Sequence, residues 1–239
     1  MTHVARLALL LTLICAIGLH IPRKVRHEFS DKQAIPEGRA PLYAAVGKLL
    51  GHTVSGTSVC TATLVGPRTL LTAAHCYDSE GSFEFIDSRA RHHIVQGGYA
   101  GSVADHKTDI AVLYLQYPIS DIAPLNIYSG RVARNHQLVL AGFGCKVMVF
   151  NGYQHECSGT PTLRENYVLS DLYNDLEGEA SGIHITPGDS GGALVDRQTN
   201  SIVGVASRFT MRLTDFGTEY DHAYFAPVSS NMVEIIILR

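Results

Sequence analysis

Short apolar runs separated by turn residues make up most of the chain from about Ile35 onward. Each run holds only a few residues, is rich in β-branched side chains, and has Gly, Pro, Asp or Asn nearby. Examples are Thr63–Val65, Thr69–Thr72, Ile110–Leu115, Gln137–Ala141, Gly192–Val195 and Ser201–Ala206. Long helical periodicity is absent from the middle of the chain, so the pattern predicts an all-β fold built from many short strands.

The N-terminal end follows a different pattern. Arg6 is followed by an apolar run from Leu7 to Leu19, which is too short for a membrane span of about 20 residues but suits the core of a signal peptide. We therefore expect residues 1–19 to be a signal peptide and residues 20–34 to be a linker or pro-segment in a secreted or periplasmic protein. The basic residues that follow the run support the alternative of an uncleaved membrane anchor.

The composition changes this picture little. The chain has 239 residues, of which 46% are hydrophobic and 17% are charged, and its formal net charge is −3. A length of about 200–250 residues is common for a single domain built from β-barrels. The near-neutral charge gives no reason to expect a nucleic acid or an anionic membrane as partner.

Cysteine usage points to an oxidising compartment. Of the five cysteines, Cys15 lies in the apolar N-terminal run and would leave with a signal peptide. The four that remain are Cys60, Cys76, Cys145 and Cys157. An even number suits disulfides, and three pairings are open at this point.

Three segments carry side chains suited to acyl transfer. In chain order they are Leu71–Cys76 (LTAAHC), Thr108–Leu113 (TDIAVL) and Pro187–Gly192 (PGDSGG). A serine hydroxyl is a weak nucleophile at neutral pH and needs a base such as histidine, which a buried carboxylate can orient. His75, Asp109 and Ser190 supply these groups. Together and in this order, the segments resemble those of the trypsin-like serine proteases.

The resemblance implies a catalytic triad and an oxyanion hole. His75 would act as the general base, Asp109 would orient it, and Ser190 would be the nucleophile. The backbone N–H groups of Gly188 and Ser190 would bind the oxyanion, in a tight glycine-rich turn. The expected function is that of a serine endopeptidase, which hydrolyses peptide bonds through an acyl-enzyme and needs neither a cofactor nor a metal.

The resemblance also implies the fold and its limits. We expect two packed six-stranded antiparallel Greek-key β-barrels and a C-terminal helix, within a peptidase domain over residues 35–239. The first barrel would carry the histidine and the aspartate, and the second the serine, with the boundary near residues 119–131. The helix would begin at Ser229 or Ser230, although the three consecutive isoleucines that follow favour a strand.

Two disulfides and one further contact follow from the same comparison. In the family a disulfide closes behind the catalytic histidine, and Cys60 and Cys76 match its two positions. Cys145 and Cys157 match no family-wide pair, so we expect them to bridge each other and to staple the inserted segment between them. Ser207 matches the serine that hydrogen-bonds the catalytic aspartate.

Activation by cleavage is a further expectation. In the family, the residue before the nucleophile, here Asp189, pairs with a newly released N-terminal amine. The sequence that starts at Ile35 (IPEG) loosely resembles the family's mature start, so we expect cleavage after Ala34 to free Ile35 for this pair. The alternative is that Asp189 pairs with a side chain and that no zymogen step exists.

The expected specificity pocket departs from the common family pattern. His184 stands six positions before the nucleophile, at the pocket floor, where an aspartate would predict cleavage after Lys or Arg. His184 either favours an acidic P1 side chain or fills space as a neutral ring. Phe209 replaces a glycine on the pocket wall, beyond Ser207 on the same bordering strand, and would narrow the entrance in favour of a small P1 residue.

Other classes of function fit less well. His92 and His93 lack a third spaced ligand for a metal site. An α/β-hydrolase would carry its triad in the order Ser, Asp, His, whereas this chain has His, Asp, Ser. The remaining alternative is a catalytically inert binding protein with a protease fold, although its usual sign, substitution of the histidine or serine, is absent. We expect a monomer whose partners are peptide or protein substrates, or a protein inhibitor.

Overall fold

The computed structural model describes residues 24–28, 32–35, 43–128, 130–132, 136–151, 154–158, 162–169, 173–174, 179–180, 183–214 and 217–228. This part of the chain is built from β-strands, joined by turns and by the short 3-10 helices η2 (Ala74–Cys76) and η3 (His106–Thr108). The predicted all-β class is confirmed. The predicted signal peptide and C-terminal helix lie outside the described residues. Within the described part, no helix is long and apolar enough to span a bilayer.

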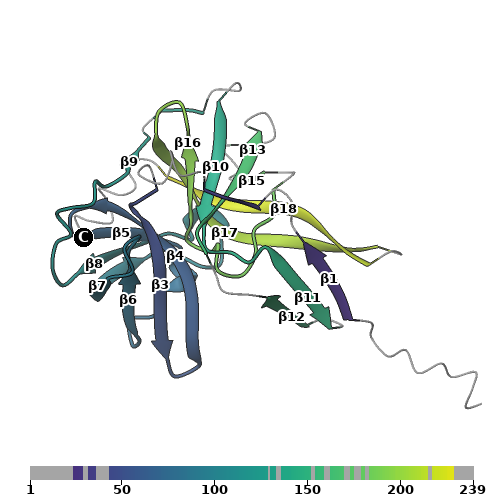
Figure 1. Ribbon diagram of the computed structural model, residues 1–239, viewed down its shortest axis with the longest axis horizontal. Helices are drawn as coiled ribbons and strands as arrows, with labels where there is room; N and C mark the ends of the chain where they lie inside the picture. The colour runs from purple at the N-terminus through teal and green to yellow at the C-terminus, as the bar shows by residue number, and fades with distance from the viewer. Residues whose placement is uncertain are drawn as a thin grey trace, which may run out of the picture.

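The first structural unit is a closed barrel of six antiparallel strands (Figure 1). Its strands are β3 (Val46–Thr53), β4 (Gly56–Gly66), β5 (Thr69–Thr72), β6 (Ser82–Ile86), β7 (His92–Ala100) and β8 (Ala111–Leu115). In space they follow the order β3-β4-β5-β8-β7-β6, and the barrel closes where Lys48 of β3 pairs with Ile86 of β6. Buried apolar side chains such as Leu49, Leu64 and Leu113 fill its interior. The first predicted barrel is confirmed.

The second unit is a curled sheet that stays open among the described residues. Its nine strands are β2 (Lys32–Ala34), β9 (Asn126–Ile127), β10 (Gln137–Gly142), β13 (Arg164–Leu169), β14 (Tyr173–Asn174), β15 (Glu179–Ala180), β16 (Ala193–Asp196), β17 (Ser201–Thr214) and β18 (Gly217–Pro227). Eight follow the order β14-β15-β18-β17-β16-β10-β13-β2, and β9 pairs in parallel with β17. The second unit is thus a half-barrel where a closed six-stranded barrel was expected; β2 pairs with β13 and forms one edge of the sheet.

Part of the segment predicted as a linker or pro-segment is paired with the sheets. Ala34 of β2 lies opposite Arg164 of β13. Further upstream, β1 (Lys24–Glu28) pairs with β11 (Val147–Asn151), which pairs in turn with β12 (Gln154–Ser158) in a small separate sheet. Figure 1 shows these three strands at one side of the molecule, away from the closed barrel.

One apolar cluster runs through the junction of the two units. It combines Leu71 and Val112 of the barrel with Val139 and Val195 of the open sheet, and all four are fully buried. A smaller cluster around Phe225 lies within the open sheet. Because packed interiors have low compressibility, this continuous cluster fixes the loops of one unit relative to those of the other.

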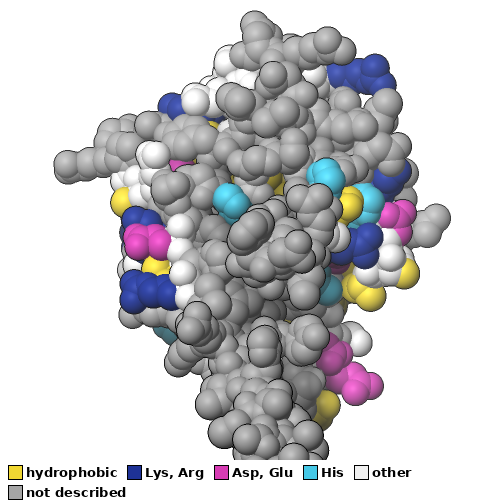
Figure 2. Space-filling model, turned by 90° about the vertical axis from the view of Figure 1, so that its right-hand side faces the viewer, with side chains coloured by type: hydrophobic (Ala, Val, Ile, Leu, Met, Phe, Trp, Pro, Cys, Tyr) yellow, Lys and Arg dark blue, Asp and Glu magenta, His cyan; other side chains and the backbone are white. Residues whose placement is uncertain are grey.

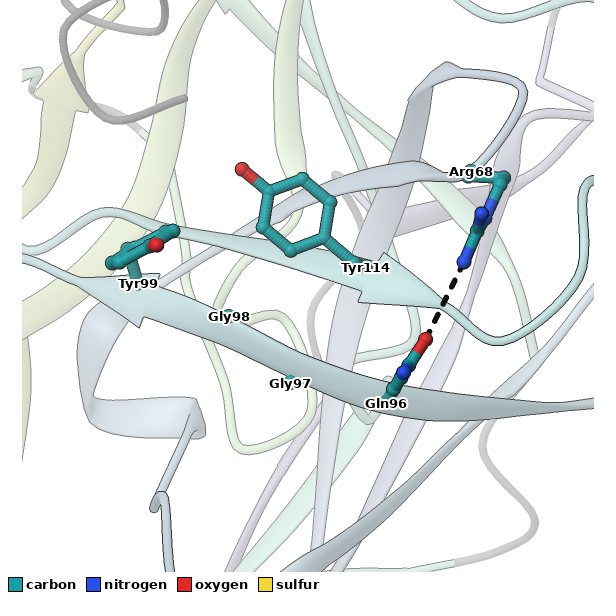
Figure 3. Close-up of a pocket in the computed structure, with 6 residues that line it drawn as sticks. All are labelled: Arg68, Gln96, Gly97, Gly98, Tyr99 and Tyr114. Carbon is teal, nitrogen blue, oxygen red and sulfur yellow. Dashed lines mark hydrogen bonds between the residues drawn. The ribbon is translucent and has the colours of Figure 1, made fainter. Parts of the chain in front are cut away.

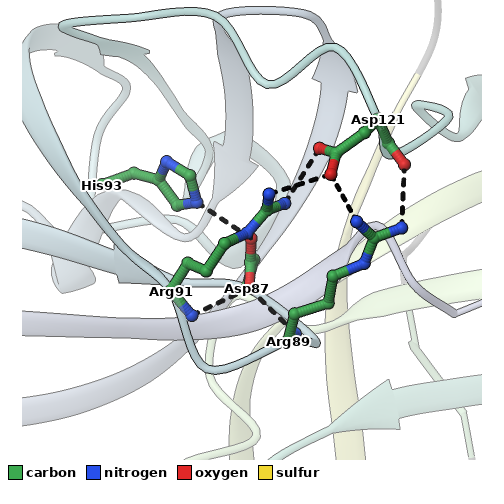
Figure 4. Close-up of polar contacts among 5 residues, drawn as sticks. All are labelled: Asp87, Arg89, Arg91, His93 and Asp121. Carbon is green, nitrogen blue, oxygen red and sulfur yellow. Dashed lines mark hydrogen bonds and ion pairs between the residues drawn. The ribbon is translucent and has the colours of Figure 1, made fainter.

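A network of charged side chains ties the barrel to the segment between the two units (Figure 4). Asp87, in the turn after β6, accepts hydrogen bonds from Arg91 Nε at 2.7 Å, from His93 Nε2 at 2.9 Å, and from the backbone N–H groups of Arg89 and Arg91. Arg91 also donates two hydrogen bonds to Asp121, whose carboxylate contacts Arg89 as well. Burial alone would raise the pKa of Asp87, but the hydrogen bonds lower it to about 2.

Candidate active site

His75 lies in η2, immediately after β5. A disulfide between Cys60 and Cys76 joins η2 to β4, as the sequence predicted. The buried cysteines hold the turn in place, while the His75 side chain remains 36% exposed. The backbone of His75 is therefore held in place, while its imidazole ring remains accessible to solvent.

The second predicted disulfide is described only in part. Cys145 is disulfide-bonded. The side chain of its predicted partner, Cys157, lies outside the described residues, although the Cys157 backbone in β12 pairs with Met148 of β11. The Cys145–Cys157 pairing therefore stays a prediction.

Asp109 lies behind His75 and is buried. Its Oδ2 atom lies 2.8 Å from His75 Nδ1 and accepts a hydrogen bond of 2.6 Å from Ser207 Oγ, while its Oδ1 atom accepts one of 3.0 Å from the His75 backbone N–H. Burial would raise the pKa of Asp109, but the hydrogen bonds from His75 and Ser207 lower it below its ordinary value. An ionised Asp109 requires the proton of a neutral His75 to sit on Nδ1, which leaves Nε2 as a base.

Ser190 lies in a loop whose backbone conformation requires glycine. Gly188 and Gly191, on either side of the serine, have positive φ angles of 97° and 80°. A Cβ atom at Gly191 would lie 2.1 Å from Thr72 Oγ1, and one at Gly188 would lie 2.7 Å from the carbonyl oxygen of Phe143. The loop thus fits tightly against both units of the fold, and a side chain at either glycine would displace it.

Thr61 connects the barrel to this loop. Its backbone N–H donates to the carbonyl oxygen of Ser190 at 2.8 Å, and its hydroxyl donates to the carbonyl oxygen of Gly188 at 2.6 Å. The same hydroxyl accepts a hydrogen bond of 3.0 Å from the backbone N–H of Phe143. Nothing in the sequence distinguishes Thr61 from the other threonines of β4, so it was not predicted as a site residue.

β17 brings the serine loop and the aspartate together. The backbone of Ala206 accepts from Gly191 N–H and donates to the carbonyl oxygen of Gly192, both at 2.8 Å. The next residue, Ser207, is the one that binds Asp109. The register with β18 shifts between Ala206 and Arg208, so a β-bulge lies at Ser207. Bulges re-aim side chains in this way next to many functional sites.

The structure does not join Ser190 to His75 by a hydrogen bond, although both residues belong to the described part. Catalytic hydrogen bonds are often long or poorly aligned without substrate and tighten when it binds. The structure therefore places Asp109 and His75 in direct contact, and backbone hydrogen bonds hold the Ser190 loop at the same junction.

Asp189 is buried against Gly142, the last residue of β10, and Gly144, which follows that strand. Its Oδ1 atom accepts from Gly144 N–H at 2.8 Å, and its Oδ2 atom accepts from the N–H and the hydroxyl of Thr186, both at 3.0 Å. Ile35 is partly buried beside a cavity of about 520 Å³ that Lys48 and Phe143 also line. In the intact chain Ile35 is bonded to Ala34 and has no free amine, so the predicted pair with Asp189 remains a prediction for the cleaved form.

The two residues predicted to shape the specificity pocket occupy the open sheet and the segment before the serine loop. His184 is half-buried, next to the buried Ile183 and Ile185. Phe209 is half-buried and packs against the smaller apolar cluster. Phe209 lies in β17, the strand that carries Ala206 and Ser207, whereas His184 lies in the segment before the serine loop.

No group of the described residues offers a convincing metal site. The ligand atoms of Cys60, His75 and Cys76 lie within 4.8 Å of one another. The two sulfur atoms form a disulfide and provide no thiolate, however, so this group cannot hold a metal through them. His92 and His93 each bind a different carboxylate, Glu84 and Asp87.

A cavity of about 530 Å³ lies apart from the triad on the outer face of the barrel (Figure 3). Its lining residues are Arg68, Gln96, Gly97, Gly98, Tyr99 and Tyr114. Figure 3 shows Tyr99 and Tyr114 side by side, with Arg68 donating to Gln96 at its other end. Its described lining residues include no serine, histidine or carboxylate, so they do not repeat the arrangement of His75, Asp109 and Ser190.

Three solved structures share the fold at low sequence identity. HL collagenase is 20% identical, with a TM-score of 0.64, over 87% of this chain and 96% of that chain. A Glu endopeptidase in complex with MPD is 18% identical, with a TM-score of 0.60, over 91% and 97%. An inactivated protease paralogue of the scabies mite is 17% identical, with a TM-score of 0.59, over 83% and 95%. A comparison with curated proteins finds no match.

At these identities the three structures establish a common fold only. Membership of a protein family therefore has to be shown by the sequence. A sequence model of the Trypsin family matches residues 44–230, which include His75, Asp109 and Ser190. Since this match spans most of the chain and agrees with the geometry around Asp109, the protein belongs to the trypsin family of serine proteases.

Proposed function

We propose that the protein is a serine endopeptidase that cleaves peptide bonds through an acyl-enzyme. The observation that carries the proposal is the buried Asp109 carboxylate, which binds His75 Nδ1 and Ser207 Oγ at once. This arrangement fixes the imidazole plane and tautomer and leaves Nε2 on the exposed side as the general base.

Ser190 would attack the scissile carbonyl while His75 takes the hydroxyl proton. The tetrahedral intermediate would collapse with transfer of that proton from His75 to the leaving amine, and water would then hydrolyse the acyl-Ser190 ester by the same route. Every step uses groups of the chain and water.

The N–H groups of Gly188 and Ser190 would stabilise the oxyanion. The positive φ of Gly188 and the hydrogen bond that its carbonyl accepts from Thr61 support a fixed orientation of this loop. One such preorganised donor is typically worth about 3–4 kcal/mol of transition-state stabilisation.

Activation by cleavage after Ala34 belongs to the same proposal. The Ala34 side chain is exposed, but its backbone pairs with Arg164 of β13, so β2 has to leave the sheet before a protease can bind it. N-terminal sequencing of the active form tests this step, and a start far from Ile35 would contradict it.

The Cys60–Cys76 disulfide supports a secreted or periplasmic location, because disulfides persist in oxidising compartments. For the primary pocket, we propose that His184 and Phe209 limit P1 to acidic or small side chains. The fold is shared with a protein described as a Glu endopeptidase, which agrees with the acidic choice.

Covalent labelling tests the central claim. The purified protein, with its N-terminus determined, is treated with a fluorophosphonate, and its intact mass is compared with that of Ser190→Ala. We expect one adduct per molecule in the wild type and none in the variant. An unlabelled but folded wild type that starts at Ile35 would favour the inert binding protein instead; the scabies mite paralogue that shares the fold is described as an inactivated protease.

A further inference from the structure

An arginine with no acidic partner among the described residues lies next to the residues that hold Asp109. Arg208 directly follows Ser207 in β17, and its side chain is exposed. Its guanidinium lies 5.5 Å from the centre of the Tyr224 ring, and its Nη2 atom lies 3.3 Å from His106 Nδ1. His106 stands three residues before Asp109, and its ring lies 4.7 Å from that of Tyr224. We call Arg208, His106 and Tyr224 the arginine cluster.

The guanidinium of Arg208 carries the positive charge of this cluster. Among the described residues, no carboxylate lies within ion-pair distance of the Arg208 guanidinium. Asp105 approaches His106, with 3.6 Å between its Oδ1 atom and Nδ1, but the Asp105 side chain is 54% exposed and hence well solvated. Figure 2 shows histidine side chains close to Lys or Arg side chains on one face of the molecule, with Asp or Glu side chains beside them.

Tyr224 and His106 also restrain the guanidinium. A guanidinium stacked over an aromatic ring is attracted to it, and the contact reduces the freedom that would be lost on binding a ligand. One of its five N–H donors faces His106, so the others remain for a planar acceptor such as a carboxylate.

The arginine cluster lies within reach of a peptide bound at Ser190. Ala206 is hydrogen-bonded to Gly191 and Gly192, and Arg208 is two residues further along the strand, about 7 Å away. On the side facing the serine loop, the pairing of β17 with β16 ends at Val205. An extended substrate advances by the same length per residue, so its side chains two or three positions from the scissile bond pass this region.

We infer that the arginine cluster is a subsite for an acidic side chain of the substrate, located within three residues of the scissile bond. The inference rests on the proposed endopeptidase function and specifies its substrate class as acidic peptides. Arg208 binds the carboxylate, while His106 and Tyr224 position Arg208. This subsite is separate from the primary pocket at His184.

Paired peptides test the inference. A sequence that the wild type cleaves in denatured casein is synthesised with Glu or Gln at each of the three positions on either side of the scissile bond. We expect kcat/KM for the wild type to be about tenfold higher with Glu than with Gln at one of these positions, as a charged hydrogen bond typically provides. Arg208→Gln should abolish this ratio, Arg208→Glu should invert it, and Arg208→Lys should keep part of it.

Two control variants separate this subsite from other causes. Arg197→Gln removes an arginine that bonds to Gln137 beyond the far end of β16, and it should leave the ratio unchanged. His184→Gln should alter preference at P1 and not at the position that depends on Arg208. Fluorophosphonate labelling of every variant reports whether the nucleophile still works.

Equal cleavage of Glu and Gln peptides at every position, with labelling intact, would overturn the subsite while leaving the endopeptidase function standing. A Glu preference that survives Arg208→Gln would likewise overturn it. Loss of labelling in the wild type would instead remove the proposed function on which the subsite rests.

Discussion

The hydroxyl group of Thr61 donates a hydrogen bond of 2.6 Å to the carbonyl oxygen of Gly188. A side chain of the closed barrel thereby holds the peptide next to the proposed oxyanion donor, which belongs to the other unit. Since the hydroxyl also accepts from Phe143 N–H, it serves two buried backbone groups at the junction.

Thr61→Val keeps the side-chain shape and removes these hydrogen bonds. Each buried group left unsatisfied costs about 1–3 kcal/mol, so the melting temperature should fall. Loosening of the Gly188 peptide should lower kcat about tenfold and change KM little, because the loss falls on the transition state. Thr61→Ser, which keeps the hydroxyl, should restore kcat. A Thr61→Val variant that is less stable but has normal kcat would show that Thr61 has a structural role only.

Gly191→Ala should eliminate fluorophosphonate labelling. The added Cβ would lie 2.1 Å from Thr72 Oγ1 at a residue whose φ is 80°, so the Ser190 loop has to move. Gly97→Ala is the matched control, since a Cβ there meets nothing within 4 Å. Circular dichroism should show both variants folded, and normal labelling of Gly191→Ala would refute the tight fit described for this loop.

Asp87 should make the stability of the protein depend on pH in the acid range. Its pKa is lowered from the ordinary 3.8 to about 2 in the folded state, so it binds protons less readily than in the unfolded chain. The stability it contributes is therefore fully present above about pH 4 and is lost as the pH falls toward 2. Melting temperatures of wild type and Asp87→Asn should differ most near pH 6 and converge toward pH 2.

The exposed turn residue Asp78 provides the comparison for this experiment. Asp78→Asn should follow the wild-type melting curve at every pH. A constant difference between wild type and Asp87→Asn from pH 6 to pH 2 would contradict the assignment to Asp87.

The double variant Cys60→Ala/Cys76→Ala should be less stable by on the order of 3 kcal/mol, because the disulfide closes a loop of about 15 residues in the unfolded chain. Urea unfolding measures the loss as a lower midpoint. Labelling of Ser190 should also slow, since η2 loses its covalent anchor to β4. A midpoint equal to that of the wild type would contradict a stabilising role for this bond.

Local motifs predicted the contacts around Asp109 well. The strings around His75 and Asp109 and the serine at position 207 were enough to anticipate the contacts that the structure has between them. The Cys60–Cys76 bridge was predicted in the same way. Each of these features depends on a combination of residue types that is rarely found outside such a site or disulfide.

The pairing of strands that are far apart in the sequence could not be predicted. The polar and basic segments that form β1 and β2 carry no alternation that would predict strands, and their pairing depends on partners more than a hundred residues away. Thr61 looked like any threonine in a strand, and its role depends on Gly188 lying opposite it. Arg208 carried no motif, and only its neighbours Tyr224 and His106 give it significance.

The bulge at Ser207 limits how this protein can change over evolutionary time. Three consecutive residues of β17 contact, in turn, the serine loop, Asp109 and the arginine cluster. Inserting or deleting one residue there would turn these side chains to the opposite face of the sheet, because side chains alternate along a strand. New substrate preferences can therefore arise in this strand by exchange of side chains at fixed length, whereas the loops that join the strands remain free to vary in length.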